Sequence, residues 1–153
     1  MKKTWIYRIL VILWMLIIFL HSNMNADASS QESGVVVTFI AEHFVPGYAE
    51  MTEAEQLQVE DTLQFIVRKG AHMTEYAILG FLIAGALGIQ GCGKLWLIAW
   101  LLGTAYACTD EFHQTFVPGR SGELRDVCID SIGVLIGSGI ASAIHKKNSC
   151  GNA

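Results

Sequence analysis

The sequence predicts an all-α integral membrane bundle of about four transmembrane helices, in one domain that covers all 153 residues. The composition is the first reason. Hydrophobic residues make up 52% of the chain, charged residues 16%, and the mean hydropathy is +0.42, whereas soluble domains carry about 25% charged residues. The 15 glycines against 2 prolines suit helices that pack closely in a membrane. Several apolar stretches also approach the length that a bilayer requires.

The first of these stretches covers about residues 4–22 and contains one charge, Arg8. It follows a basic start and is close to spanning length. A signal peptide is the alternative, because Ala26-Asp27-Ala28 has the small-x-small form of a cleavage site. We interpret the stretch as an uncleaved membrane helix.

The polar region 22–67 contains a short amphipathic segment, which we place at the outer membrane surface. Its apolar residues are Val35, Val36, Val37, Phe39, Ile40 and Phe44. Pro46-Gly47 predicts a turn that ends the segment. Thr52-Glu53-Ala54-Glu55 has the form of a capping box and predicts the start of a helix that continues into the second span.

Three further spans follow this helix start. We expect them at about residues 71–89, 95–112 and 126–145. In the last span, Gly133, Gly137 and Ala141 recur every four residues, which predicts a seam of small residues for close helix packing. Because the seam suits packing within one chain as well as a dimer, the sequence leaves the oligomeric state open.

The distribution of Lys and Arg predicts the orientation, because cytoplasmic loops carry an excess of both. Six lie on the side of the two termini: Lys2, Lys3, Arg8, Lys94, Lys146 and Lys147. Four lie on the other side: Arg68, Lys69, Arg120 and Arg125. All 14 acidic residues lie in or toward the segments 22–67 and 110–126. We therefore expect a multi-pass membrane protein with cytoplasmic termini and a charged site that faces the exterior.

This charged site is a cluster of residues that three helices bring to one face of the bilayer. Its expected members are Arg68, Lys69, His72, Glu75, Tyr76, Asp110, Glu111, His113, Gln114, Arg120, Asp126 and Asp130. Arg68, His72 and Glu75 share one helical face. Pro118-Gly119 predicts a type II turn that projects Arg120 at the membrane edge. Each ionisable residue inside a span costs about 2.5–3.5 kcal/mol to insert, so several together indicate a functional site or a set of ion pairs.

Three interpretations of the cluster are open. The ion pairs serve only to hold the helices in register, with no ligand. The basic residues bind the phosphate of an anionic lipid headgroup or of a cell-wall precursor, since Arg binds phosphate bidentately. The cluster is a membrane-embedded enzyme site, in which Glu75 or an aspartate is the general base, His72 or His113 the acid, and Arg120 stabilises a phosphate charge.

Neither a metal nor a cofactor is expected. His72, Glu75 and His113 are suitable ligand types, but their spacing matches no zinc signature. The four cysteines lack C-x-x-C spacing, and we expect them to be mostly unpaired. Cys108 and Cys128 lie in apolar segments, where we expect a structural role, and the sequence does not decide whether they pair. The sequence shows no nucleic-acid signal, so the expected partners are the lipid bilayer and an anionic headgroup or cell-wall precursor.

Three motifs resemble the VanZ-like family of bacterial membrane proteins. They are RKGAHMTEY at 68–76, DEFHQTFVPGR at 110–120 and DVCIDSIG at 126–133. The resemblance implies a cell-envelope protein, with a founding member linked to resistance against teicoplanin, and it implies no established reaction. The expected function is thus to lower susceptibility to glycopeptide antibiotics through the outward charged site. A membrane enzyme on a lipid phosphate and a structural or assembly factor are the alternatives.

Overall fold

The computed structural model describes residues 2–24, 26–88, 95–120 and 122–150. Within these residues it contains five α-helices, one 3-10 helix and no strand, so the prediction of an all-α protein is confirmed. The elements are α1 (Lys2–Ser22), α2 (Ala26–Phe44), η1 (Tyr48–Glu50), α3 (Glu53–Ala86), α4 (Leu95–Gln114) and α5 (Leu124–Cys150).

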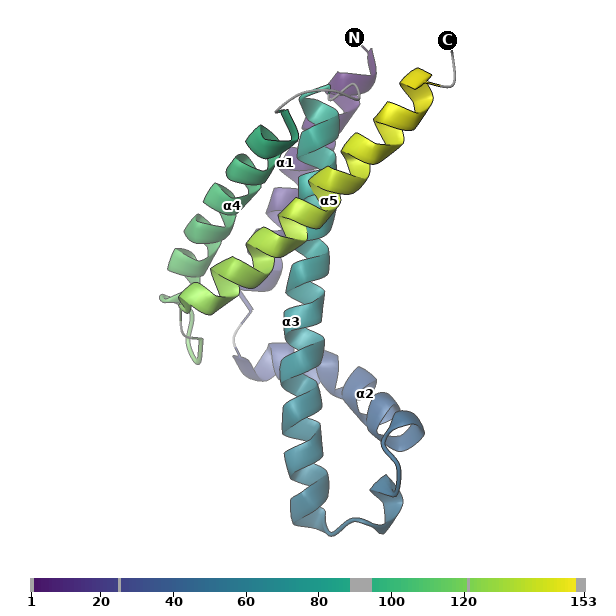
Figure 1. The fold of residues 1–153 in the computed structure, drawn as a ribbon. Coiled ribbons are helices and arrows are strands. Elements are labelled where there is room, and N and C mark those ends of the chain that lie inside the picture. The colour runs from purple at the N-terminus through teal and green to yellow at the C-terminus, as the bar shows by residue number, and fades with distance from the viewer. Residues whose placement is uncertain (1, 25, 89–94, 121, 151–153) are drawn as a thin grey trace.

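Helices α1, α4, α5 and the second half of α3 form a bundle (Figure 1). The first half of α3 projects from this bundle, and α2 packs against it, so that the two form an arm joined through η1. The start of α1 and the end of α5 lie at the same end of the bundle, opposite the arm (Figure 1).

Two described helices, rather than the predicted four, are long and apolar enough to cross a membrane. They are Thr4–Ser22 in α1 and Leu124–Ile144 in α5. The other two predicted spans contain ionisable residues, with Glu75 inside α3 and Asp110 near the end of α4, and each of these residues lowers the mean hydropathy of its helix. The second predicted span lies in a 34-residue helix that begins at Glu53, and its expected end at Ile89 lies outside the described residues.

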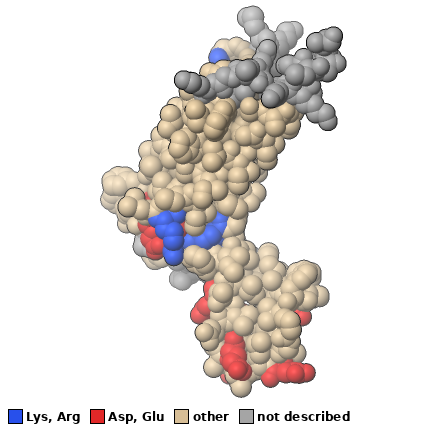
Figure 2. Space-filling model, viewed as in Figure 1, with Lys and Arg blue, Asp and Glu red and all other residues tan. Residues whose placement is uncertain are grey.

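The surface of the bundle is apolar over much of its length. Its exposed large hydrophobic residues include Trp5, Ile9, Ile12, Leu16 and Leu20 on α1, Ile98 and Leu101 on α4, and Ile136 and Ile140 on α5. In Figure 2 the charged side chains gather at the base of the bundle and on the arm, and the flank between the base and the far end carries none on this face. Such a surface is stable against lipid chains and unfavourable in water. It favours a membrane environment.

The predicted seam of small residues packs α5 against α3 within one chain. A Cβ atom on Gly133 would lie 2.3 Å from the carbonyl oxygen of Met73, and one on Gly137 would lie 1.8 Å from that of Ala77. Ala141, one turn further, is buried. Only glycine allows the two backbones to approach this closely. The seam therefore fixes the position of α5 along α3.

The predicted short amphipathic segment is a 19-residue helix, α2, and is longer than expected. Val37 and Ala41 on α2 are buried, whereas Val35, on the opposite side, is 79% exposed. The turn predicted at Pro46-Gly47 is confirmed, because Gly47 has φ 73° and the Tyr48 N–H donates to the carbonyl oxygen of Val45 at 3.3 Å.

The predicted capping box at the start of α3 is also confirmed. The Glu55 carboxylate accepts hydrogen bonds from the backbone N–H of Thr52 at 2.9 Å and from its hydroxyl at 2.7 Å. The Thr52 side chain in turn accepts the backbone N–H of Glu55. Two backbone donors at the helix start are thereby satisfied, which stabilises the outer end of the arm.

The capping box makes the outer end of the arm sensitive to acid. The Thr52 hydroxyl and then its backbone N–H hold the pKa of Glu55 below its ordinary value of 4.5. Because the folded-state pKa is lowered, this contribution to stability is complete above the ordinary value and is lost as the pH falls through the lowered one. We expect the Tm difference between the wild type and a Glu55→Ala variant to shrink over that range. A difference that stays constant into strong acid would contradict the prediction.

Candidate functional site

The twelve predicted residues lie at the base of the bundle, where α3 leaves the arm, α4 ends and α5 begins (Figures 1 and 2). Nine of them line three neighbouring cavities: Arg68, Lys69, His72, Glu75, Glu111, Gln114, Arg120, Asp126 and Asp130. Tyr76, Asp110 and His113 line none of the three. The structure thus gathers most of the cluster around one hollow region.

The two larger cavities measure about 270 Å³ and 220 Å³. The first lies beside the end of α1 and is also lined by His21, Met24, Ser33, Val67, Ala71 and Glu75. The second lies beside the start of α5 and is also lined by Phe65, Lys69, Gln114, Gly119, Glu123, Arg125 and Asp126. Because Arg68, His72 and Arg120 line both, we treat them as one space, the basal cleft.

Arg120 reaches the basal cleft from the predicted type II turn. Gly119 has φ 76°, and the Arg120 N–H donates to the carbonyl oxygen of Val117 at 3.1 Å, which confirms the turn. In the guanidinium, Nη2 donates to the carbonyl oxygen of His21 at 3.3 Å. Nε and Nη1 are buried and have no hydrogen-bond partner in the described part of the chain. Burial and then the positive charge of Arg68 lower the pKa of Arg120.

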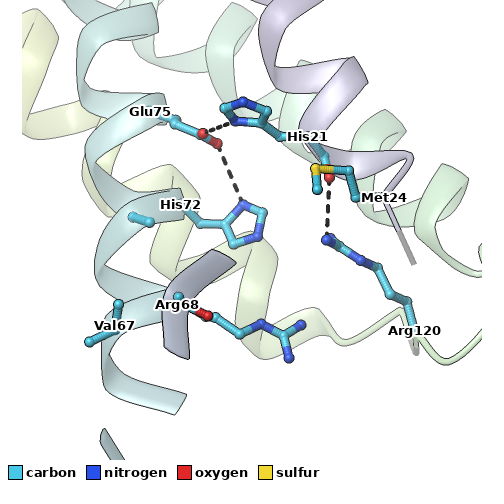
Figure 3. A pocket seen from close by; sticks show the side chains of 9 residues that line it. His21, Met24, Val67, Arg68, His72, Glu75 and Arg120 are labelled. Carbon is cyan, nitrogen blue, oxygen red and sulfur yellow. Dashed lines mark hydrogen bonds and ion pairs between the residues drawn. The ribbon is translucent and has the colours of Figure 1, made fainter. Parts of the chain in front are cut away.

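Glu75 connects two histidines on different helices. One carboxylate oxygen lies 2.6 Å from Nδ1 of His21, at the end of α1, and the other lies 3.8 Å from Nδ1 of His72, one turn earlier on α3. The indole N–H of Trp14 donates to the backbone carbonyl oxygen of Glu75 at 2.9 Å. In Figure 3 the other ring nitrogen of His72 points toward the space between Arg68 and Arg120.

The start of α5 is held by ion pairs and by a backbone hydrogen bond. Lys69 forms an ion pair with Asp126, and the two side chains are 22% and 13% exposed. Arg125 pairs with Glu123 at 2.8 Å in a more exposed position. The Glu111 carboxylate accepts the backbone N–H of Glu123 at 2.8 Å. This part of the cluster agrees with the interpretation that ion pairs hold the helices in register.

Buried polar groups tie α3 to α4 inside the bundle. The hydroxyl of Tyr76 donates to the Asp110 carboxylate at 3.1 Å, and the Gln114 amide donates to the same oxygen at 3.3 Å. Tyr76 is fully buried, and Asp110 and Asp130 are nearly so. These hydrogen bonds hold α3 and α4 together next to the basal cleft.

Sequence reasoning placed His113 in the cluster and omitted His21. The His113 ring packs against Phe19 of α1, with ring centroids 4.9 Å apart, and does not line the cleft. His21 lines the cleft because α1 ends beside α3. The sequence did contain a signal that His21 belongs to the site. His21 stands at the end of the first apolar stretch, at the depth where the other predicted spans become polar.

The described residues contain no group of three His, Cys, Asp or Glu side chains placed to hold a metal ion. Cys108 and Cys128 are free thiols, and both are exposed.

The residues of the cluster also lie within the part of the chain that matches a known protein family. The sequence model of the VanZ/LLP1 family matches residues 7–145, a range that contains the three motifs and the whole cluster. No significant match was found among curated proteins or among solved structures. Because the family match covers nearly the whole chain, the protein belongs to the VanZ/LLP1 family.

Proposed function

We propose that this protein binds an anionic group of a cell-envelope component in the basal cleft and thereby lowers susceptibility to glycopeptide antibiotics such as teicoplanin. The guanidinium of Arg120 carries the proposal. Two of its nitrogens are buried without a hydrogen-bond partner among the described residues. Such donors cost free energy unless they are paired, and arginine pairs bidentately with phosphate or carboxylate.

The charge balance of the cleft supports an anionic ligand. Lys69 is neutralised by Asp126 and Arg125 by Glu123, and Glu75 contacts two histidines. Arg68 and Arg120 form no ion pair within the described ranges. They line the same two cavities, and Figure 3 shows both at the first of these. An anion between the two guanidinium groups would reduce their mutual repulsion.

We place the protein in the cell membrane as a multi-pass protein, with cytoplasmic termini and an outward-facing cleft. The apolar helices Thr4–Ser22 and Leu124–Ile144 support the membrane location. The orientation rests on the distribution of Lys and Arg. The start of α1 and the end of α5, which lie at the end of the bundle opposite the arm, agree with it (Figure 1).

Binding is tested with inorganic phosphate and the purified protein in detergent micelles, by calorimetry. Removal of a hydrogen bond to a charged group costs about 1.5–3 kcal/mol. We therefore expect Arg120→Gln to weaken phosphate binding about 10- to 100-fold. Arg8→Gln is the matched control, because Arg8 stacks on Trp5 in the first half of α1, far from the cleft along that helix. Equal affinity in Arg120→Gln and the wild type would disprove the assignment of the site.

The cellular role is tested with the same three proteins in a teicoplanin-sensitive Gram-positive host, at matched membrane abundance. We expect protection from the wild type and Arg8→Gln, and none from Arg120→Gln. If phosphate binds but no form protects, the glycopeptide part of the proposal is wrong. Nanodiscs of phosphatidylglycerol, compared with phosphatidylcholine, separate a lipid headgroup from a water-soluble source of the anion.

A further inference from the structure

We infer that the basal cleft carries out phosphoryl transfer, with His72 as the nucleophile toward a phosphate monoester held between Arg68 and Arg120. The inference rests on the proposed anion binding and names the ligand and its reaction. These three residues are the ones that line both large cavities. A phosphate bound by the two guanidinium groups would therefore lie beside the imidazole.

His72 is oriented for attack through Nε2. Its Nδ1 lies 3.8 Å from a carboxylate oxygen of Glu75, while the other ring nitrogen points toward the space between the two arginines (Figure 3). A proton on Nδ1, facing the carboxylate, leaves the lone pair of Nε2 free. The distance exceeds that of a hydrogen bond, which is common at catalytic pairs without a bound ligand.

Glu75 is fixed in place and acts as a positioning residue for His72. Its second carboxylate oxygen is held by His21 at 2.6 Å, and its backbone carbonyl accepts the indole N–H of Trp14 at 2.9 Å. Both contacts come from α1: His21 holds the carboxylate, and Trp14 fixes the backbone of Glu75. A carboxylate held in this way keeps one histidine tautomer and stabilises the imidazolium that forms on attack.

The cleft suits a phosphate monoester of a partly apolar alcohol. A monoester is dianionic above the second pKa of phosphate, near 6. Arg68 and Arg120, which form no ion pair in the described part of the chain, match that charge. Met24, Val67 and Ala71 line the first cavity beside the arginines. They offer apolar contacts to the carbon chain of the alcohol. The volume of about 270 Å³ admits the phosphate together with only part of such a chain, and the rest would lie outside.

The reaction proceeds in two balanced steps. Nε2 of His72 attacks phosphorus, a P–N bond forms, and the P–O bond to the alcohol breaks. The leaving oxygen takes a proton from solvent, which reaches the cleft beside the half-exposed His21. Water then attacks the phosphohistidine, the P–N bond breaks, and inorganic phosphate leaves while the proton of the water returns to solvent. Arg68 and Arg120 stabilise the charge on the phosphoryl oxygens in both steps.

The test uses the purified full chain in detergent micelles with two probes, para-nitrophenyl phosphate and dihexanoyl phosphatidic acid. We expect release of inorganic phosphate and an acid-labile phosphohistidine. His72→Gln is expected to lower turnover at least about 100-fold while inorganic phosphate still binds within a few-fold of the wild-type affinity. His113→Gln is the matched control, because the His113 ring packs on Phe19 outside the cleft.

Glu75 has a separate readout. We expect Glu75→Gln to lower kcat more than it raises KM, and Glu75→Asp to recover part of kcat, which a purely structural role would not produce.

Each outcome separates this inference from the proposed function. If phosphate binding depends on Arg120 but neither probe is hydrolysed and no phosphohistidine forms, phosphoryl transfer is disproved and the binding function remains. Unchanged turnover in His72→Gln, with its Tm unchanged, would exclude His72 as the nucleophile. If the wild type binds no phosphate, both proposals fail.

Discussion

A Gly137→Ala variant is expected to lose at least about 2 kcal/mol of unfolding free energy, within the range for overpacked cores. The added Cβ would lie 1.8 Å from the carbonyl oxygen of Ala77 and 2.7 Å from its carbonyl carbon. These are backbone atoms of α3, so no rotamer change relieves the contact, and α5 must shift as a whole. The measurement is the Tm in detergent micelles, together with the fraction that elutes as a folded monodisperse species.

Gly139→Ala is the matched control, since the same substitution is made two residues along α5. A Cβ on Gly139 meets no atom within 4 Å. Alanine favours a helix over glycine by about 0.8–1 kcal/mol, so this variant should be as stable as the wild type or more so. If both variants lower the Tm equally, the loss reflects α5 in general and the close approach to Ala77 is not the cause.

A Lys69→Met variant is expected to lose about 2 kcal/mol, less than the roughly 3–5 kcal/mol for a fully buried ion pair that loses one partner, because this pair is only partly buried. The Asp126 side chain is 13% exposed and would lose its ion pair with Lys69. Its remaining cationic partner would be Arg125, whose Nε lies 4.0 Å from the carboxylate. Methionine keeps most of the volume, so the change isolates the charge. The expected result is a lower Tm and weaker association of α5 with α3.

Two further variants identify the cause of that loss. Reversal of the pair, with Lys69→Asp and Asp126→Lys together, should recover part of the Tm, because opposite charges again face each other. Arg125→Gln should change the free energy of unfolding by less than about 0.5 kcal/mol, since Arg125 is 59% exposed and exposed ion pairs contribute little. No recovery in the reversed pair would mean that Lys69 acts through packing rather than charge.

Features that depend on neighbouring residues could be predicted from the sequence. The turns at Pro46-Gly47 and Pro118-Gly119 follow from the dihedral preferences of those two residue types. The capping box follows from residues three apart. The seam on α5 follows from the four-residue spacing of Gly133, Gly137 and Ala141. Each of these signals is contained within one element.

The lengths of the membrane spans and the contacts between helices that are distant in the sequence could not be predicted. Two of the four predicted spans are long and apolar enough to cross a membrane among the described residues, because Glu75 in α3 and Asp110 near the end of α4 lower the hydropathy of stretches whose length alone suited a bilayer. The contact of His21 with Glu75 joins residues 54 positions apart, and no local pattern specifies such a pairing. His113 shares a helix with Asp110, but its ring turns toward α1, which depends on the packing of α1 and α4.

The length of α3 has a mechanical consequence. Its 34 residues extend over about 51 Å, whereas the hydrocarbon core of a bilayer is about 30 Å thick. The second half of α3 packs against α5 along the seam, and the first half belongs to the arm (Figure 1). Arg68, His72 and Glu75 lie near the middle of α3, between the half that packs on α5 and the half that belongs to the arm. The arm and the residues of the basal cleft therefore belong to one continuous helix, so that a displacement of the arm would be passed to the cleft through the backbone of α3.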